Sequence, residues 1–235
     1  LGCEVLDFRD LNLTLLRKFE DFLLYERKVV QRTAINYLML IRTIYNFARK
    51  EYNVDDKNYP FGKGKIQIKF PETEKIGLNI EEVQLLEITN DITPAQRRAV
   101  DTWLLSFYFA GIRVADVIKL NFSEFKGDRL YYRMGKNKRL VPLTITDKAK
   151  KILDHYAKEK KENDDLVFPY LSGIDLKDKK SVATRISTIT RSLNRRLEIV
   201  ADKLAIEKKL SMHIARHSFG NISGDKIPIQ MLQKL

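Results

Sequence analysis

The chain of 235 residues is 44% hydrophobic and 31% charged, a composition typical of folded globular proteins and not of disordered ones. Its 43 Lys and Arg against 31 Asp and Glu give a net charge of +12, so the expected partner is a polyanion, either nucleic acid or an acidic membrane surface. No apolar run approaches about 18 residues, no basic-then-apolar leader is present, and the single cysteine, Cys3, excludes an internal disulfide; these features favour a cytoplasmic protein that does not span a membrane.

Residues 1–59 are expected to form a small helical domain. Apolar residues recur there at three- and four-residue steps, first at 15–23 and again at 31–48, as one buried helix face requires. Between Arg27 and Lys50 the chain carries six Lys or Arg and no Asp or Glu. This acid-free stretch is either a solvated helix face or a surface that contacts the phosphates of a nucleic acid.

A basic linker is predicted at 60–78. Prolines and glycines interrupt the helical pattern there, and Lys63 and Lys65 are among the lysines that keep the segment positively charged. A short extended piece is expected at 66–70. A linker that passes along a polyanion would be rich in lysine for the same reason.

Residues 79–235 are expected to form a second, larger domain. Asn79 with Glu82, and Thr93 with Gln96, are capping-box patterns that each predict the start of a helix. The dense apolar run at 103–110 predicts a buried central helix that Gly111 ends.

The remaining elements of this domain alternate between one hairpin and several helices. The stretch "LYYRMGKNKRLVPL" at 130–143 predicts two short strands around a turn at 135–138. Further helices are expected at 146–156, 181–210 and 212–219. The predicted fold is therefore mainly α, with a small helical domain and a larger α+β domain of mostly helices with a small antiparallel hairpin or sheet.

Three basic islands in the second domain could carry chemistry, and the first two surround Arg113 and the hairpin turn. Arg113 follows the buried helix and a glycine, with Asp116 one turn later, so a rigid junction would hold its guanidinium. The plain alternative is a surface arginine that pairs with Asp116 by helical spacing. Lys136 and Lys138 occupy the hairpin turn, where lysines commonly contact only solvent.

The third island is "LSMHIARHSF" at 210–219. His213 and Arg216 are three residues apart, hence on one helix face, so an imidazole and a guanidinium can reach the same anion. The plain alternative is a histidine paired with a neighbour on its helix. Three histidines with one cysteine offer too few ligands for a metal site, so none is expected.

The order of these islands resembles the catalytic domain of the tyrosine recombinases, also called phage-type integrases. The shared set is Gly-x-Arg after a core helix, a hairpin lysine followed by Val-Pro-Leu, and His-x-x-Arg-His on a late helix. In the first domain, "RTAINYLMLIRTIYNFARK" is similar to the core-binding domain of that family. The resemblance runs from about Leu11 to the end of the chain and is nearest to integrases of mobile elements. It implies DNA integration and site-specific recombination through a 3′-phosphotyrosine link, without cofactor or metal.

The resemblance also assigns roles to the three islands. It implies that Arg113 and Arg216 clamp the non-bridging oxygens of the scissile phosphate, that Lys136 (or else Lys138) protonates the departing 5′ oxygen, and that His213 assists proton transfer. Asp116 and His217 are implied as supporting residues. This division suits phosphoryl transfer, since fixed guanidinium donors match the charge on the equatorial oxygens and a poor alkoxide leaving group needs a proton donor.

Double-stranded DNA is the implied partner, with a homotetramer on DNA during strand exchange, a monomer when free, and neither a membrane nor a small-molecule substrate. The basic stretches outside the three islands supply the candidate DNA-binding residues. They are Arg27, Lys28, Arg32, Arg42, Lys63, Lys65, Arg185, Arg191 and Arg195.

One feature departs from the family pattern. The nucleophilic tyrosine should follow His-x-x-Arg, yet all ten tyrosines precede Arg216, the last being Tyr170. We therefore expect these 235 residues to bind DNA without cleaving it, and the tyrosine to lie beyond residue 235 or on a partner chain. The alternatives are a non-enzymatic DNA-binding accessory or regulator on the same fold and, less well matched by the small first domain, a type IB topoisomerase.

Overall fold

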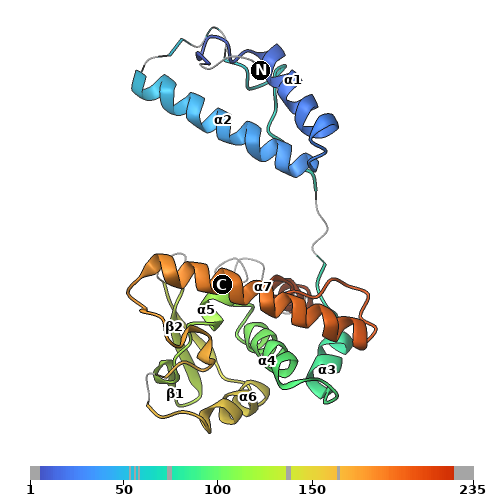
Figure 1. The fold of residues 1–235 in the computed structure, drawn as a ribbon, viewed down its shortest axis with the longest axis vertical. Helices are drawn as coiled ribbons and strands as arrows, with labels where there is room; N and C mark the ends of the chain where they lie inside the picture. Colours follow the sequence, from blue (N-terminus) through green and yellow to red (C-terminus); the bar gives the residue numbers. More distant parts are fainter. Residues whose placement is uncertain are drawn as a thin grey trace. The chain divides into compact units, whose positions relative to one another are not determined.

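The computed structural model describes residues 6–52, 54, 55, 57, 59–72, 76–135, 139–162 and 165–224. The chain divides into two compact units, Leu1–Glu74 and Lys75–Leu235, each with its own core (Figure 1). Helices dominate both units, and one small antiparallel sheet lies in the second. The predicted fold class is confirmed. Among the described residues, no helix is both long and apolar enough to cross a bilayer.

The first unit is a small helical body. Its helices are α1 (Leu13–Asp21), which continues into a π-helical turn η1 (Phe22–Glu26), and α2 (Gln31–Tyr52). Asn12 caps α1, because its side-chain oxygen accepts the amide of Leu15 at 3.0 Å.

The first unit extends past the predicted boundary at residue 59. Phe61 and Ile66, which fall in the predicted linker 60–78, form a short β-bridge with each other. Both are buried and pack against Leu16 of α1 and Leu38 of α2. Two short helices cannot enclose a core alone, so the following segment folds back to cover them.

The second unit is built around α4 (Pro94–Tyr108), preceded by α3 (Ile80–Ile88) and followed by α5 (Val114–Val117). Both predicted capping boxes are present at the starts of α3 and α4. On one side of α4, Trp103 packs in a cluster shared with α3, α7 and α8. On the other side, Leu105 packs with the sheet and α6. The prediction of a buried central helix is confirmed.

The sheet has three antiparallel strands in the order β1-β2-β3. They are β1 (Phe125–Lys126), β2 (Arg129–Arg133) and β3 (Leu140–Thr144). The predicted hairpin is β2 and β3, in which Tyr132 pairs with Val141. The sequence did not predict β1, because two residues are too short to show alternation.

Three helices complete the second unit: α6 (Asp147–Ala157), α7 (Lys179–Lys203) and α8 (Met212–Ser223). Two 3-10 turns, η2 (Phe122–Glu124) and η3 (Pro169–Leu171), connect elements. The helix predicted at 181–210 is wrong at its end, since α7 stops at residue 203. Ala205 adopts a left-handed φ of 54°, and the Ile206 amide returns to the Ala201 carbonyl at 2.9 Å. The turn places Ile206 in the core, which helical continuation would prevent.

Candidate active site

Arg113 lies at a sharp junction between α4 and α5. After α4 ends, Ala110 and Gly111 take left-handed φ angles of 56° and 67°, and Arg113 then forms the N-cap of α5. A Cβ on Gly111 would lie 2.8 Å from the Cα of Arg216 on α8. The junction that carries Arg113 therefore touches the helix that carries the second arginine.

Arg216 is fastened to the same junction. Its Nη1 donates a hydrogen bond to the carbonyl of Gly111 at 3.1 Å, across 105 positions of the chain. Burial lowers the pKa of the Arg216 guanidinium, and the positive charge of Arg113 lowers it further. The structure thus brings Arg113 and Arg216 within electrostatic range, and two cations held this way make a site for an anion.

Tyr132 joins this group from β2, where it points inward and is only 4% exposed. Burial and the negative charge of Asp116 raise its pKa to about 12, while Arg113 and Arg216 act in the opposite direction. The charges of both arginines and of the carboxylate therefore all act on this one phenol. Sequence reasoning missed Tyr132, although its inward position in the strand alternation before the hairpin turn could have indicated it.

Asp116 is buried and connects the junction to the hairpin. Its Oδ1 accepts the amide hydrogen of Gly135 at 3.2 Å, and a Cβ on Gly135 would lie 2.7 Å from that oxygen. Asp116 therefore positions the end of β2 beside the arginines and is not an exposed partner of Arg113. Lys136 and Lys138, the candidate proton donors, lie outside the described residues.

The two histidines of the third island lie on α8. His213 is exposed, and its ring meets that of His217 edge-to-face, with centroids 4.5 Å apart and an angle of 86°. Because Arg216 is three residues from His213, the imidazole and the guanidinium emerge from neighbouring turns of one helix. Among the described residues, no group of three His, Cys, Asp or Glu side chains could hold a metal ion.

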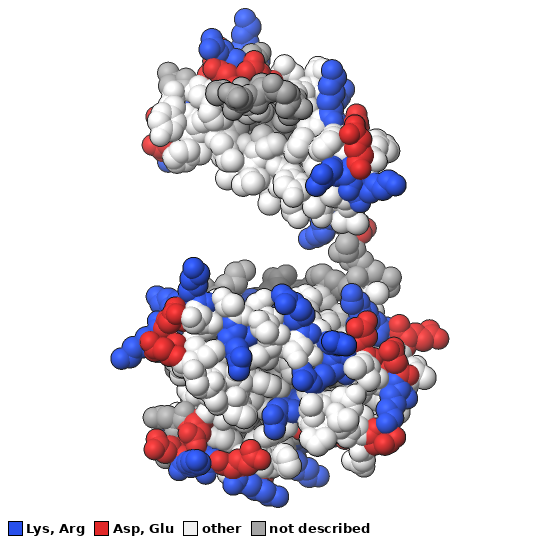
Figure 2. Space-filling model, in the orientation of Figure 1, with Lys and Arg blue, Asp and Glu red and all other residues white. Residues whose placement is uncertain are grey.

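All nine candidate DNA-binding residues are exposed, but several also make contacts within the fold. Arg32 lies over the ring of Phe70 at 5.1 Å, and Arg185 Nε donates to the Tyr170 carbonyl at 3.3 Å. Arg191 and Arg195 lie one turn apart on the exposed side of α7. On the face of the second unit in Figure 2, Lys and Arg spread across the middle, whereas Asp and Glu gather toward the edges.

In the first unit, Arg42 lines an open cavity of about 810 Å³ together with Arg49 and Lys50. Arg49 lies over the ring of Tyr59 at 4.4 Å, so the cavity wall combines basic and aromatic side chains. Arg27, Lys28 and Lys63 lie on exposed turns, and the Lys65 ammonium donates to the Tyr59 carbonyl.

A family model described as the phage integrase family matches residues 79–235, more than half of the chain. The chain belongs to the phage integrase family. A second model, the phage integrase SAM-like domain, matches residues 2–68 in the first unit. The family inferred from the order of the basic islands is confirmed. No curated protein sequence matches the chain significantly.

Solved structures of this family share the fold. The XerH site-specific recombinase bound to its difH substrate is 14% identical with a TM-score of 0.66; the alignment covers 97% of this chain and 64% of that one. The Tn1549 transposon integrase in complex with transposon right end DNA is 12% identical with a TM-score of 0.69, covering 99% and 79%. A lambda integrase tetramer bound to a Holliday junction is 13% identical with a TM-score of 0.69, covering 99% and 65%. The chain thus spans about two thirds of the XerH and lambda integrase chains.

Proposed function

We propose that the protein cleaves and rejoins DNA at specific sites through a 3′-phosphotyrosine link, and so integrates or recombines a mobile element. The observation that carries this proposal is the attachment of Arg216 to the Gly111 carbonyl beside Arg113. Family membership supplies the reaction, and this contact supplies a place where one phosphodiester can meet two guanidiniums. In this proposal, a phosphate of a bound duplex is the anion that the two cations bind.

In this proposal, Arg113 and Arg216 bind the two non-bridging oxygens of the scissile phosphate. Burial, and after it the positive charge of Arg113, lower the pKa of Arg216, so the two cations repel each other. A phosphate between them removes that repulsion, and the added charge of the transition state strengthens the effect. Fixed guanidiniums need no reorganisation when the charge develops.

The other residues of the site either transfer protons or hold neighbouring groups in place. Lys136, or Lys138 in its place, donates a proton to the departing 5′ oxygen, and His213 assists proton transfer at the phosphate. Asp116 supports the hairpin by accepting the Gly135 amide, and His217 supports the ring of His213. Tyr132 is buried with a raised pKa, which makes it a poor nucleophile, so we do not assign the attack on the phosphate to Tyr132.

The proposed partner is double-stranded DNA, which the nine exposed basic residues contact through its phosphates. Strand exchange between two duplexes requires several active sites at once, so the working form is a homotetramer on DNA, and the free protein is a monomer. The lambda integrase tetramer on a Holliday junction supports this assembly. We also propose that the reaction takes place in the cytoplasm. It needs neither a metal nor a nucleotide cofactor, because the covalent protein–DNA link conserves the energy of the broken phosphodiester bond.

The decisive experiment uses a nicked suicide substrate that carries the element's own ends, with the protein encoded by the complete gene. A covalent protein–DNA adduct that survives denaturing gel electrophoresis is expected, and mass spectrometry should place it on a tyrosine. A protein that binds the ends tightly yet never forms the adduct would instead be a DNA-binding accessory, and the enzymatic proposal would fail.

A further inference from the structure

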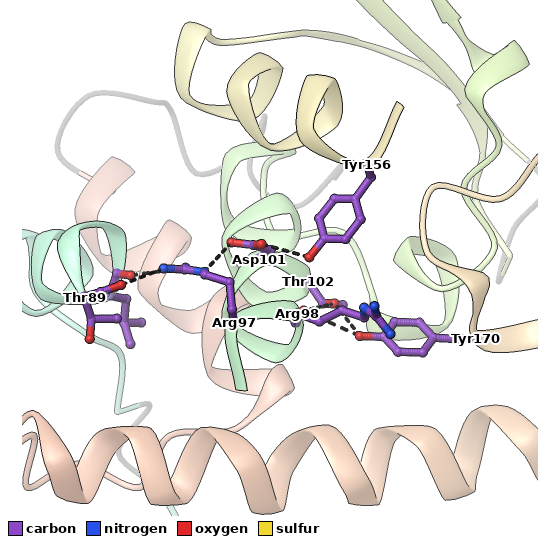
Figure 3. Close-up of polar contacts among 8 residues, drawn as sticks. Thr89, Arg97, Arg98, Asp101, Thr102, Tyr156 and Tyr170 are labelled. Atoms are coloured by element: carbon purple, nitrogen blue, oxygen red, sulfur yellow. Dashed lines mark hydrogen bonds and ion pairs between the residues drawn. The ribbon is translucent and has the colours of Figure 1, made fainter. Parts of the chain in front are cut away.

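Two neighbouring arginines at the start of α4 have opposite environments (Figure 3). Arg97 is satisfied inside the fold: its Nε donates to Asp101 Oδ1 at 2.9 Å and its Nη1 donates to the Thr89 carbonyl at 2.9 Å. Arg98 points the other way, toward Tyr170, and its Nε is buried without a hydrogen-bond partner. Buried donors are almost always paired, so the Arg98 Nε needs a partner that the described residues do not supply, either an ordered water or a bound ligand.

Arg98 borders a small cavity between α4 and α7. The cavity measures about 180 Å³, and Arg98, Arg196, Ser192 and Tyr170 supply its polar lining, with Leu193 at its apolar side. A water molecule occupies about 30 Å³, so the cavity has room for a tetrahedral oxyanion together with a few waters.

The polar walls of this cavity are held in place by the helices that carry them. The Arg196 guanidinium donates to the Ser192 hydroxyl one turn earlier on α7. The hydroxyl of Tyr170 lies 2.9 Å from that of Thr102, which in turn donates to the Arg98 carbonyl at 2.7 Å. Tyr170 is therefore tied to the same turn of α4 that carries Arg98, and the cavity keeps its shape without a ligand.

The cavity carries positive charge that its own walls do not neutralise. No Asp or Glu is among the described residues that line it. Asp101, on the same helix as Arg98, is already engaged by Arg97 at Oδ1 and by the Tyr156 hydroxyl at Oδ2, the latter at 2.9 Å. Burial raises the pKa of Tyr170 to about 12, yet Arg98 and Arg196 both act to lower it, so both guanidiniums lie near this hydroxyl.

We propose that the cavity between Arg98 and Arg196 is a second phosphate-binding site, separate from the pair Arg113 and Arg216. Guanidinium groups from α4 and α7, with the Ser192 and Tyr170 hydroxyls in the same lining, match a tetrahedral oxyanion, which accepts several hydrogen bonds at once. The ligand is a phosphate group, either free inorganic phosphate or a backbone phosphate of nucleic acid. This inference does not rest on the proposed strand exchange, because the cavity requires only the anion.

Calorimetric titration of the full chain with inorganic phosphate, at constant ionic strength in chloride, tests the site. Arg98→Gln and Arg196→Gln should each weaken one class of phosphate binding by roughly tenfold or more, and Arg113→Gln should weaken a different class. Arg129→Gln is the matched control, since it removes one exposed arginine of the same unit outside either site. Thermal unfolding of each variant verifies that it is folded.

The outcomes are distinct for the two sites. If Arg98→Gln and Arg196→Gln both titrate like Arg129→Gln, the inference is wrong, whatever Arg113→Gln does. If acetate binds the cavity as tightly as phosphate, the ligand is a carboxylate and the phosphate assignment falls. If Arg113→Gln weakens one class of phosphate binding and leaves the class that depends on Arg98 and Arg196 intact, the two sites are independent.

A duplex-binding assay then distinguishes a backbone phosphate from free inorganic phosphate as the ligand of the cavity. If a backbone phosphate occupies the cavity, Arg98→Gln should reduce the slope of log K against log salt by about 1 relative to Arg129→Gln. If free phosphate is the ligand, the slope should match that of Arg129→Gln while the calorimetric site is lost.

Discussion

Gly111 shows how much of the active site depends on one missing side chain. Its φ of 67° lies in the left-handed region, which glycine adopts readily, and α8 packs so closely on it that any Cβ would meet the Arg216 backbone at 2.8 Å. The same residue offers its carbonyl to Arg216. Backbone direction, helix approach and arginine orientation are thus set at one position.

Gly111→Ala should reduce both stability and cleavage. The left-handed φ costs about 1–2 kcal/mol for alanine, and the contact with α8 should add roughly 1–3 kcal/mol of overpacking. Gly127→Ala is the control, because Gly127 has a φ of 59° and a Cβ added to it would have nothing within 4 Å. Urea denaturation of both variants gives the difference; equal losses would show that α8 yields easily and that the close approach is unimportant.

Arg113→Gln and Arg216→Gln should separate binding from chemistry. In the protein with its complete gene sequence, each change should slow formation of the covalent adduct by about 3 kcal/mol or more of transition-state stabilisation. Duplex affinity should fall little, because many other cations contact the backbone. Single-turnover cleavage and a gel-shift titration measure the two effects. Parallel losses in both assays would contradict the assigned roles.

At the scale of elements, α4 organises the second unit by a buried polar chain as well as by its apolar faces. Asp101 is 7% exposed and receives hydrogen bonds from Arg97 on its own helix and from Tyr156 on α6 (Figure 3). Burial raises the pKa of Asp101, and its two donors oppose that rise. The carboxylate therefore joins α4 to α6 through the hydrogen bond from Tyr156.

Tyr156→Phe should destabilise the protein by about 1.5–3 kcal/mol, because a buried carboxylate loses a hydrogen bond. The raised pKa of Asp101 means that the folded state takes up its proton first as the pH falls. The difference from the wild type should therefore be largest at neutral pH and narrow in acid. Tyr131→Phe, on an exposed tyrosine, is the control. Denaturation at several pH values tests this; a pH-independent difference would mean that Asp101 is not the group affected.

At the scale of the whole molecule, the net charge of +12 is spread over two units with separate cores. The nine candidate DNA-binding residues lie on α2 and the turns of the first unit and on α7 of the second. Basic residues on two separate units can contact a longer stretch of duplex than basic residues on one unit. Binding should therefore involve many phosphates and depend strongly on salt.

Duplex affinity should fall linearly and steeply on a plot of log K against log salt. The single substitutions Arg191→Gln and Arg195→Gln should each reduce the slope by about 1, because each removes one phosphate contact. Arg17→Gln on α1, an exposed arginine outside the proposed surface, should leave the slope unchanged. Fluorescence anisotropy at four or five salt concentrations suffices. A flat dependence would contradict the charge argument altogether.

The predictions from the sequence are confirmed where a few neighbouring residues decide the local structure. The capping boxes at Asn79 and Thr93 set the starts of α3 and α4, and the alternation of 130–143 sets the hairpin. The end predicted for α7 is wrong, because the chain turns at Ala205. This turn buries Ile206 against core residues that are distant in the sequence. Phe61 and Ile66 were assigned to a linker for the same reason, since nothing near them in the chain shows what they cover.

The amino-acid sequence alone determined the helical class, the hairpin, the net charge and, through the order of its basic islands, the family. The helical class, the hairpin and the net charge follow from short-range periodicity, turn residues, capping and composition, whereas the family was inferred from the resemblance of its motifs. Only the tertiary structure decided that the Arg216 guanidinium donates to the Gly111 carbonyl, that Tyr132 is buried where the charges of both arginines act on it, and that Arg98 lines a cavity while Arg97 does not. Such contacts join residues about 70 to 105 positions apart, and they depend on how α4, α7 and α8 pack, which no local pattern encodes.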